Sequence, residues 1–351
     1  MNIISTDTYK IRFKDEGYGH LNELITLNNY TNIYVLVDEN TKKLCLTRLK
    51  EKASFKFEII EIKSGEIHKN IDTCVDIWNR LTNKNADRNS LLINLGGGVI
   101  TDIGGFIAST YKRGIDFVNI PTTLLSMVDA SIGSKTGINL NSIKNQIGLF
   151  SDPLSVIVDT DYLKTLSKRE INSGYAEIFK HSIISNSNFK KLVENPNLAY
   201  DEDIIASSIE LKNKVVKKDK FEKDVRKHLN FGHTIGHAVE SLFMNKKNKL
   251  LHGEAIAIGM ICESYISSKI NGLEIDKANE IKNHLNKFFS KVSFSKSDIN
   301  EICNLIKYDK KNHINIPKFV LLKDLGLVET DINVDMNLVS ASFDYYSVKL
   351  Y

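Results

Sequence analysis

The stretch SLLINLGGGVITDIGGFIAST, residues 90–110, decides the fold. It opens as a short apolar run typical of a buried strand and continues as a helical segment, with Gly96, Gly97 and Gly98 at the junction. Glycines at the end of a parallel strand let the backbone turn tightly and approach a pyrophosphate, whose charge is met by N–H groups at the helix start. The pattern GGGxxxD therefore indicates a dinucleotide site, with a plain tight turn as the alternative. Asp102 would contact ribose, the nicotinamide amide or metal-bound water, or else is a charge in the first helical turn.

Similar β-branched runs lie on both sides of this stretch, at 32–40, 57–62, 116–120 and 155–160. A helical pattern separates the second of these from the glycine stretch, with its apolar residues on one face: Ile71, Val75, Trp78 and Leu81. Strands separated by helices predict a largely parallel sheet covered on both sides. We therefore expect an α/β domain over residues 1–167.

The pattern changes near residue 168 to long amphipathic helices. We predict them at 168–184, 203–218, 230–245, 253–271, 275–290 and 297–308, with one later strand at 318–323 as part of a small hairpin. A chain of 351 residues exceeds the ~250–300 residues that one core supports. A mainly helical second domain over 168–351 is the expectation.

The bulk composition excludes several classes of protein. A formal charge of +4 is too balanced for a surface that coats nucleic acid. The four cysteines lie far apart without a CxxC pair, so neither a disulfide framework nor a cysteine zinc site is predicted. There is no secretory leader pattern and no run of ~18 apolar residues. We expect a cytoplasmic protein that binds neither membrane nor nucleic acid.

The stretch NFGHTIGHAVE, 230–240, places His233 and His237 one helical turn apart. Side chains at i and i+4 share a helix face, so this spacing permits a metal site. It permits equally two structural histidines that hydrogen-bond within the protein. The spacing alone leaves both interpretations open.

Six separated motifs together resemble the 3-dehydroquinate synthase family over roughly residues 30–325. They are LGGGVITDIGGFIASTYKRGIDFVNIPTTLLSMVDASIGSKTGINL, KNQIGLF, LKTLSKREINSGYAEIFKH, RKHLNFGHTIGHAVE, LHGEAIAIGM and YDKK. The resemblance implies a homodimer with a Rossmann-like domain, a helical domain and an active site in the cleft between them. It also implies that 3-deoxy-D-arabino-heptulosonate 7-phosphate is converted to 3-dehydroquinate and phosphate, with NAD reduced and regenerated within one turnover.

The same resemblance implies a zinc site, in which cobalt can substitute, held by Glu177, His233 and His252. A catalytic zinc usually has three protein ligands and leaves a position for substrate, which suits this set. His237 would lie beside the substrate as a hydrogen-bond donor or proton relay.

Candidate substrate residues also follow from the resemblance. Lys135, Lys212 and Arg226 would bind the carboxylate and the ring oxygens, and Asp129 would orient a hydroxyl near the nicotinamide. Arg113 would reach the phosphate bound by the partner protomer. The phosphate itself would meet Asn145, Lys180, Asn230 and either Lys310 or Lys311.

For the cofactor, the resemblance adds an acid at the end of the first clear strand, Asp38, as the partner of a ribose diol, which favours NAD over its 2′-phosphorylated form. The remaining candidates are Glu66, Lys69, Gly96, Gly97, Gly98, Asp102, Thr122, Thr123, Lys144 and Thr165.

The chain departs from the family pattern in three places. Ser134 stands where a second glycine is usual before Lys135, so we expect either an ordinary backbone there or a shifted loop. Ser167 stands where a proline is common, and Asp224 stands where a glycine is common. Three alternative functions remain: a related sugar-phosphate cyclase, a polyol or glycerol dehydrogenase of the same fold, and a silent member retained for its interactions.

Overall fold

The chain forms two compact units. The computed structural model describes residues 3–141, 143–244, 246–307 and 317–348. One unit comprises Met1–Ser167 and Ile205–Lys220, and the other comprises Lys168–Ile204 and Phe221–Tyr351. We predicted a single boundary after residue 167, whereas most of helix α8 (Glu202–Lys218) belongs to the first unit. Asn213 on this helix donates a hydrogen bond to the Ser5 carbonyl at 2.9 Å, a tertiary contact that helical periodicity does not reveal.

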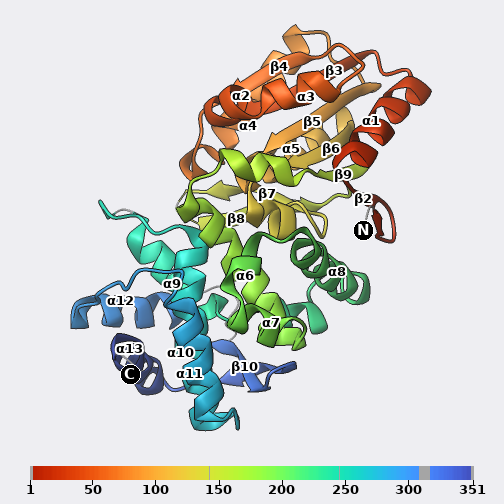
Figure 1. Ribbon diagram of the computed structural model, residues 1–351. Coiled ribbons are helices and arrows are strands. Elements are labelled where there is room, and N and C mark those ends of the chain that lie inside the picture. Colours follow the sequence, from red (N-terminus) through yellow and green to blue (C-terminus); the bar gives the residue numbers. More distant parts are fainter. Residues whose placement is uncertain (1–2, 142, 245, 308–316, 349–351) are drawn as a thin grey trace. The chain divides into compact units, whose positions relative to one another are not determined.

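The first unit contains a seven-stranded sheet in the order β1-β2-β9-β6-β5-β3-β4 (Figure 1). Its neighbours pair in parallel except β1 and β2, which are antiparallel. The strands are β1 (Ile3–Ser5), β2 (Lys10–Phe13), β3 (Asn32–Asp38), β4 (Glu58–Ile62), β5 (Ser90–Gly96), β6 (Asp116–Pro121) and β9 (Ser155–Val158). The predicted parallel α/β architecture is confirmed.

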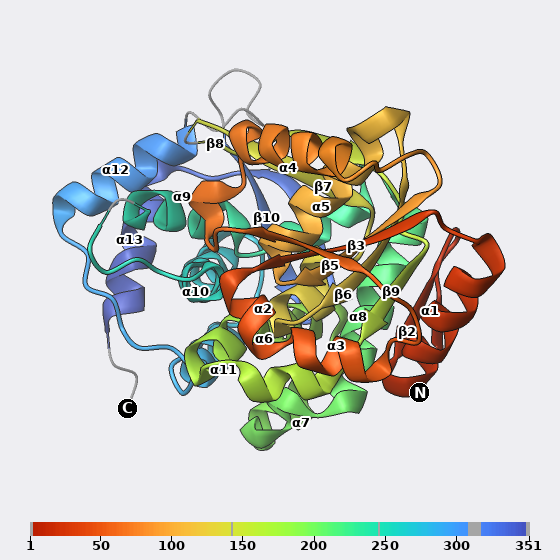
Figure 2. The ribbon, with the colours of Figure 1, turned by 90° about the horizontal axis from the view of Figure 1, so that it is seen from above.

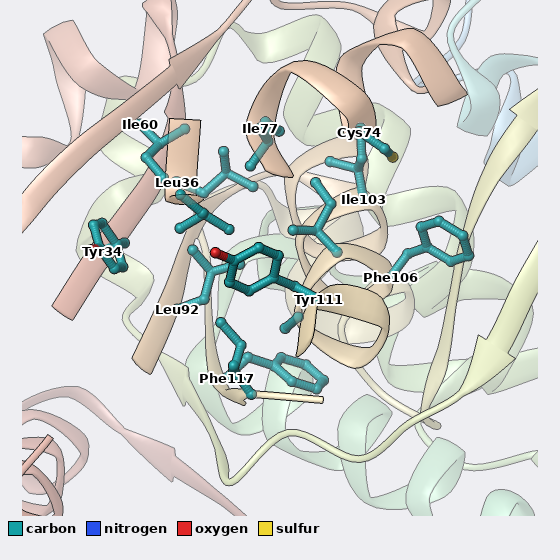
Figure 3. Close-up of a cluster of buried hydrophobic side chains, with 14 of the residues drawn as sticks. Tyr34, Leu36, Ile60, Cys74, Ile77, Leu92, Ile103, Phe106, Tyr111 and Phe117 are labelled. Atoms are coloured by element: carbon teal, nitrogen blue, oxygen red, sulfur yellow. The ribbon is translucent and has the colours of Figure 1, made fainter. Parts of the chain in front are cut away.

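Helices cover this sheet on both faces. In Figure 2, α4 (Ile71–Asn83) lies on one side of β3 and β5, and α2 (Glu39–Leu44) and α3 (Leu46–Lys52) lie on the other. Figure 3 shows the core under α4 and α5 (Gly98–Thr110), where Leu36, Ile77 and Ile103 are within the buried cluster. Helix α1 (Lys14–Asn28) precedes β3. Each face of the sheet is apolar because both faces are covered.

An antiparallel hairpin of β7 (Lys135–Leu140) and β8 (Ile143–Phe150) was not predicted. Strand β8 does not alternate buried and exposed residues: Ile147 is 37% exposed, Leu149 40% and Phe150 44%. A half-buried strand is predicted from alternating apolar and polar residues in the sequence. This segment lacks that alternation, so the hairpin could not be predicted.

Among its described residues, the second unit is helical apart from one hairpin, β10 (Lys318–Asp324) with β11 (Leu327–Asn333). Its helices are α6 (Lys168–Ser185), α7 (Phe189–Glu194), α9 (His233–Phe243), α10 (His252–Ile270), α11 (Ile275–Leu285), α12 (Lys296–Lys307) and α13 (Met336–Ser347). The helix predicted from residue 230 begins at His233, because Val225–Asn230 form a 3-10 turn. Within the described ranges, no helix combines the length and the apolar character needed to cross a bilayer.

Candidate functional site

The carboxyl ends of β3, β5 and β6 form the first group of candidate residues. Asp38 ends β3, Gly96 ends β5, and Thr122 follows Pro121 at the end of β6. The parallel registers pair Leu36 with Asn94 and Gly96 with Pro121, so these ends share one edge of the sheet. The strand order reverses between β3 and β5, and ligands of doubly wound sheets bind at such a switch point.

The three glycines provide room rather than an unusual backbone conformation. None of them has a positive φ, and Gly97 has φ of −74°. A Cβ on Gly97 would lie 3.0 Å from Thr123 Cγ2, and one on Gly98 would lie 3.2 Å from Ala130 Cβ. Helix α5 begins here without a side-chain cap, so its first N–H groups suit an anion. The uncapped start of α5 and its closely packed glycines are the features that a pyrophosphate site would need.

Lys69 is the centre of a buried polar cluster beside the start of α5. It is 3% exposed, pairs with the Asp102 carboxylate, and donates to Asn145 Oδ1 at 2.5 Å. Burial raises the pKa of Asp102, and the Lys69 ammonium opposes that shift. Asn139, which we did not predict, links the cluster: its amide donates to Glu66 Oε1 at 2.9 Å and its Oδ1 accepts from Asn145 N.

The other cofactor candidates lie in local caps and turns. Asp38 caps α2, with Oδ1 accepting from Thr41 N at 2.8 Å. Thr123 Oγ1 accepts from Ser126 N, and Thr165 donates to the Tyr162 carbonyl at 2.7 Å. Lys144 is half-buried on β8.

Asp129 lies in a π-helical turn, Ser126–Ala130. Such turns are rare and occur frequently at functional sites. Lys212 of α8 donates to the Asp129 carbonyl oxygen and to Oδ1, both at 2.5 Å, so the structure brings these two candidates together. Lys135 is exposed at the start of β7.

Ser134 has φ of +65°, in the left-handed region where glycine is favoured. Of the two alternatives, the ordinary backbone is therefore wrong. The Ser134 hydroxyl donates to Asp152, which also pairs with Lys220 at 2.7 Å. This hydrogen bond offsets the cost of the left-handed conformation.

We expect Ser134→Ala to lower the free energy of unfolding by about 1 kcal/mol, because it keeps the strained backbone and loses the hydrogen bond. Ser134→Gly should change the free energy of unfolding little, because glycine removes the cost of the left-handed backbone and loses the hydrogen bond, and these two effects are of similar size. Urea unfolding of the three proteins measures the difference. Equal stabilities of the two variants would contradict the left-handed conformation.

Arg113 is exposed in a tight turn at the end of α5, with φ of +68° between Lys112 (φ +50°) and Gly114 (φ +115°). Its side chain is therefore accessible to solvent.

In the second unit, Glu177 of α6, His233 of α9 and His252 of α10 bring their ligand atoms within 4.8 Å of one another. Glu177 Oε1 lies 3.6 Å from His233 Nε2 and 3.5 Å from His252 Nε2. Glu177 is fully buried, and its carboxylate forms an ion pair with the Lys180 ammonium, although neither oxygen has a hydrogen bond of good geometry among the described residues. Two imidazoles and a buried carboxylate fit a divalent transition metal.

The hydrogen bonds of the two rings leave Nε2 aimed at this centre. His233 Nδ1 lies 3.2 Å from the Phe231 carbonyl, to which it can only donate, and His252 Nδ1 lies 3.4 Å from Glu240 Oε2. A bonded Nδ1–H fixes the tautomer that offers the Nε2 lone pair. A second possible set, His237, Glu240 and His252, shares His252. We favour the first set, because Glu240 already bonds the Nδ1 atom of His252.

The charges of two of the three residues, Glu177 and His233, fit metal binding. Burial would raise the pKa of Glu177, but Lys180 and His233 hold it well below its usual value. Burial and the Lys180 ammonium hold the pKa of His233 well below normal, so this ring is neutral. Burial lowers the pKa of His252, yet the neighbouring carboxylates of Glu177 and Glu240 raise it to about 10, so this ring must release a proton when a metal ion binds.

Glycines bring the three ligand helices into backbone contact. A Cβ on Gly253, beside His252, would lie 2.0 Å from the Ser173 carbonyl oxygen of α6. A Cβ on Gly259 of α10 would lie 1.9 Å from the Gly232 oxygen, at the start of α9. Only glycine permits these approaches, so the relative positions of the ligands depend on backbone packing.

The remaining candidates of this unit lie on the same elements or in the turn before α9. Lys180 is 1% exposed and pairs with Glu177 one turn earlier on α6, while His237 is exposed one turn after His233. Arg226 is 3% exposed, and Asn230 donates to Glu222 at 2.6 Å. Lys310 and Lys311 lie outside the described residues.

The sequence reasoning missed Glu222 and Glu240. Glu240 stands seven residues after His233, on the same helix face, and this spacing was a usable signal. Glu222 lies in a turn with φ of +57° and carries no periodic signal.

A doubly wound sheet with a glycine-rich start of α5, together with a helical unit bearing Glu177, His233 and His252, defines a class of enzymes that combine a dinucleotide with a metal ion. The family model for the 3-dehydroquinate synthase N-terminal domain matches residues 59–173, and that for the C-terminal domain matches 174–312. The chain belongs to the 3-dehydroquinate synthase family.

Named relatives agree with this family. The 3-dehydroquinate synthase of Parabacteroides distasonis is 40% identical over 93% of this chain and 95% of its own length. That of Campylobacter jejuni subsp. doylei is 38% identical over 92% of this chain and 96% of its own. These matches cover both units.

Two solved structures share the fold. A 2-deoxy-scyllo-inosose synthase complexed with carbaglucose-6-phosphate, NAD+ and Co2+ superposes with a TM-score of 0.86 at 24% identity, over 98% of this chain and 99% of that one. A 2-epi-5-epi-valiolone synthase from Streptomyces hygroscopicus, with NAD+ and Zn2+ bound, gives 0.86 at 21% identity over 99% of each chain. At these identities the likeness concerns the fold alone.

Proposed function

We propose that this chain converts 3-deoxy-D-arabino-heptulosonate 7-phosphate to 3-dehydroquinate and phosphate as an NAD- and metal-dependent lyase. The observation that carries the proposal is the centre of Glu177, His233 and His252, whose ligand atoms lie within 4.8 Å of one another. The full-length relationship to named 3-dehydroquinate synthases supports the substrate.

The metal ion would be zinc, with cobalt as a substitute, held by Glu177 Oε1 and the Nε2 atoms of the two histidines. When bound, it would lower the pKa of a coordinated substrate hydroxyl, as zinc lowers that of water from ~16 to ~7. Lys180 would balance the Glu177 charge and bind substrate phosphate, and His237 would move protons on the exposed side of the ligand helix.

NAD would lie at the edge of the sheet where β3, β5 and β6 end. The pyrophosphate would meet Gly97 and Gly98 at the start of α5, and Asp38 would bind the ribose diol. When bound, the cofactor would accept a hydride from the substrate and return it within one turnover. Further contacts would come from Glu66, Lys69, Gly96, Asp102, Thr122, Thr123, Lys144 and Thr165.

The substrate would be held mainly by charge. Arg226 offers a planar fork for the carboxylate, and Lys135 and Lys212 act as mobile point charges. Asp129, already fixed by Lys212, would orient a ring hydroxyl. The phosphate would bind to Asn145, Asn230 and a lysine of the pair 310 and 311. The substrates of the other cyclases lack the carboxylate that this guanidinium fork would recognise, which argues against them.

We also propose a homodimer in the cytoplasm. Exposed apolar side chains on β8 and the exposed turn that carries Arg113 would suit an interface with a second copy, whose phosphate Arg113 would reach. The four cysteines are free, which suits a reducing compartment.

The test is a turnover assay on metal-depleted protein with zinc or cobalt restored and NAD present, recording phosphate release and nicotinamide absorbance together. We expect metal-dependent phosphate release, catalytic NAD and no steady NADH. Accumulation of NADH in proportion to product would indicate a dehydrogenase. Turnover of sedoheptulose or glucose phosphates in preference to the heptulosonate would indicate a related cyclase.

A further inference from the structure

Glu263 of α10 is a buried acid that none of the proposed functions uses. It is fully buried, and its two oxygens accept hydrogen bonds from the backbone N–H groups of Gly232 at 2.6 Å and Ile235 at 3.1 Å. These are the N-cap and the third residue of α9, whose own N-cap provides no side-chain bond. Glu263 therefore caps α9 from a neighbouring helix, at the end where the helix dipole favours negative charge.

The peptide group that donates a hydrogen bond to Glu263 also accepts one from His233. The N–H of Gly232 and the carbonyl of Phe231 belong to a single peptide group. Glu263 accepts from that N–H, and His233 Nδ1 donates to that carbonyl at 3.2 Å. A chain of hydrogen bonds thus runs from the carboxyl of Glu263 through one peptide to the imidazole of His233, and such chains polarise one another.

The two imidazoles are supported in parallel ways. His252 faces the Glu240 carboxylate directly, at 3.4 Å, whereas His233 is connected to Glu263 through the peptide. Carboxylate partners of this kind fix the orientation of a ligand histidine and raise its basicity. Burial raises the pKa of Glu263 to about 8, while the N–H groups of Ile235, Gly232 and Thr234 lower it, so its charge depends on these contacts.

We propose that Glu263 is a positioning residue for the metal site: through the Phe231–Gly232 peptide it sets the place and the basicity of His233. This inference rests on the proposed function, because it assumes that His233 binds a metal ion. It predicts that changing Glu263 alters metal affinity and ligand geometry, and does more than lower stability.

The experiment is a Co2+ titration of the metal-depleted full chain in competition with a chelator, recording the visible d–d absorption. We expect Glu263→Gln, which replaces one acceptor oxygen by an N–H2 group, to weaken Co2+ binding about tenfold or more and to shift the absorption bands. Asp335→Ala is the matched control. Asp335 caps α13 of the same unit, accepting from Asn337 N at 2.7 Å, so its loss should lower stability and leave Co2+ affinity unchanged.

Wild-type affinity and bands in Glu263→Gln would overturn the inference. If that variant does not fold, Glu263→Asp keeps the carboxyl group and shortens the reach, and the same weakening is expected from it. Failure of both variants to fold would assign Glu263 to folding alone, against the inference. If the unaltered protein binds no Co2+, the proposed metal site itself fails, independently of Glu263.

Discussion

Replacement of His233 by alanine should leave the purified protein without bound metal and lower its turnover about a thousandfold or more. In the proposed site this ring is one of three ligands, and a metal ion contributes several kcal/mol to charge stabilisation in reactions of this kind. Elemental analysis after desalting, together with phosphate release, measures both effects.

His237→Ala is the matched comparison, since His237 lies one turn further along the same helix face. We expect this variant to keep its metal and to lose about a hundredfold in turnover, as fits a residue that transfers protons. Metal loss in His237→Ala with retention in His233→Ala would reverse the assignment of the two histidines.

The second large effect concerns Gly253. Alanine there would place a Cβ 2.0 Å from the Ser173 carbonyl oxygen and 2.6 Å from two further backbone atoms, so α10 must move away from α6. Because backbone cannot yield as a flexible side chain does, we expect a loss of about 3 kcal/mol in the free energy of unfolding. Displacement of His252 from Glu177 should reduce metal affinity as well.

Gly19→Ala serves as the control for the same chemical change. Gly19 lies within α1, is exposed, and has nothing within 4 Å of its Cβ position. Alanine there should stabilise the helix by up to about 1 kcal/mol. Urea unfolding compares the two variants, and a Gly253→Ala protein as stable as the unaltered chain would show that α6 and α10 are not in backbone contact.

Local pattern was sufficient for much of the fold. The runs at 32–40, 90–96 and 116–120 became central strands, because they are buried on both faces and read as continuous apolar segments. The hairpin of β7 and β8 lacked such a signal. Helix α8 was predicted correctly as a helix but assigned to the wrong unit, since its membership depends on tertiary contacts such as Asn213 to Ser5.

The residues of the candidate site could be predicted only where they lie in motifs that resemble the family. The metal set depended on the resemblance, since His233 and His237 could not be told apart by spacing, and the structure gathers Glu177, His233 and His252. Glu263 could not be found this way, because its role depends on two backbone N–H groups whose direction is a property of the folded turn.

The first unit is discontinuous in the chain, and this bears on the order in which the protein can be made. Ile205–Lys220 complete that unit, although Lys168–Ile204, which precede them, belong to the other. A nascent chain that has just emerged to Ser167 therefore lacks the helix that supplies Asn213 to Ser5 and Lys212 to Asp129. During synthesis from the N-terminus, the first unit can therefore be completed only after Lys220 has emerged, when the first segment of the second unit is already outside and its larger part is still to come.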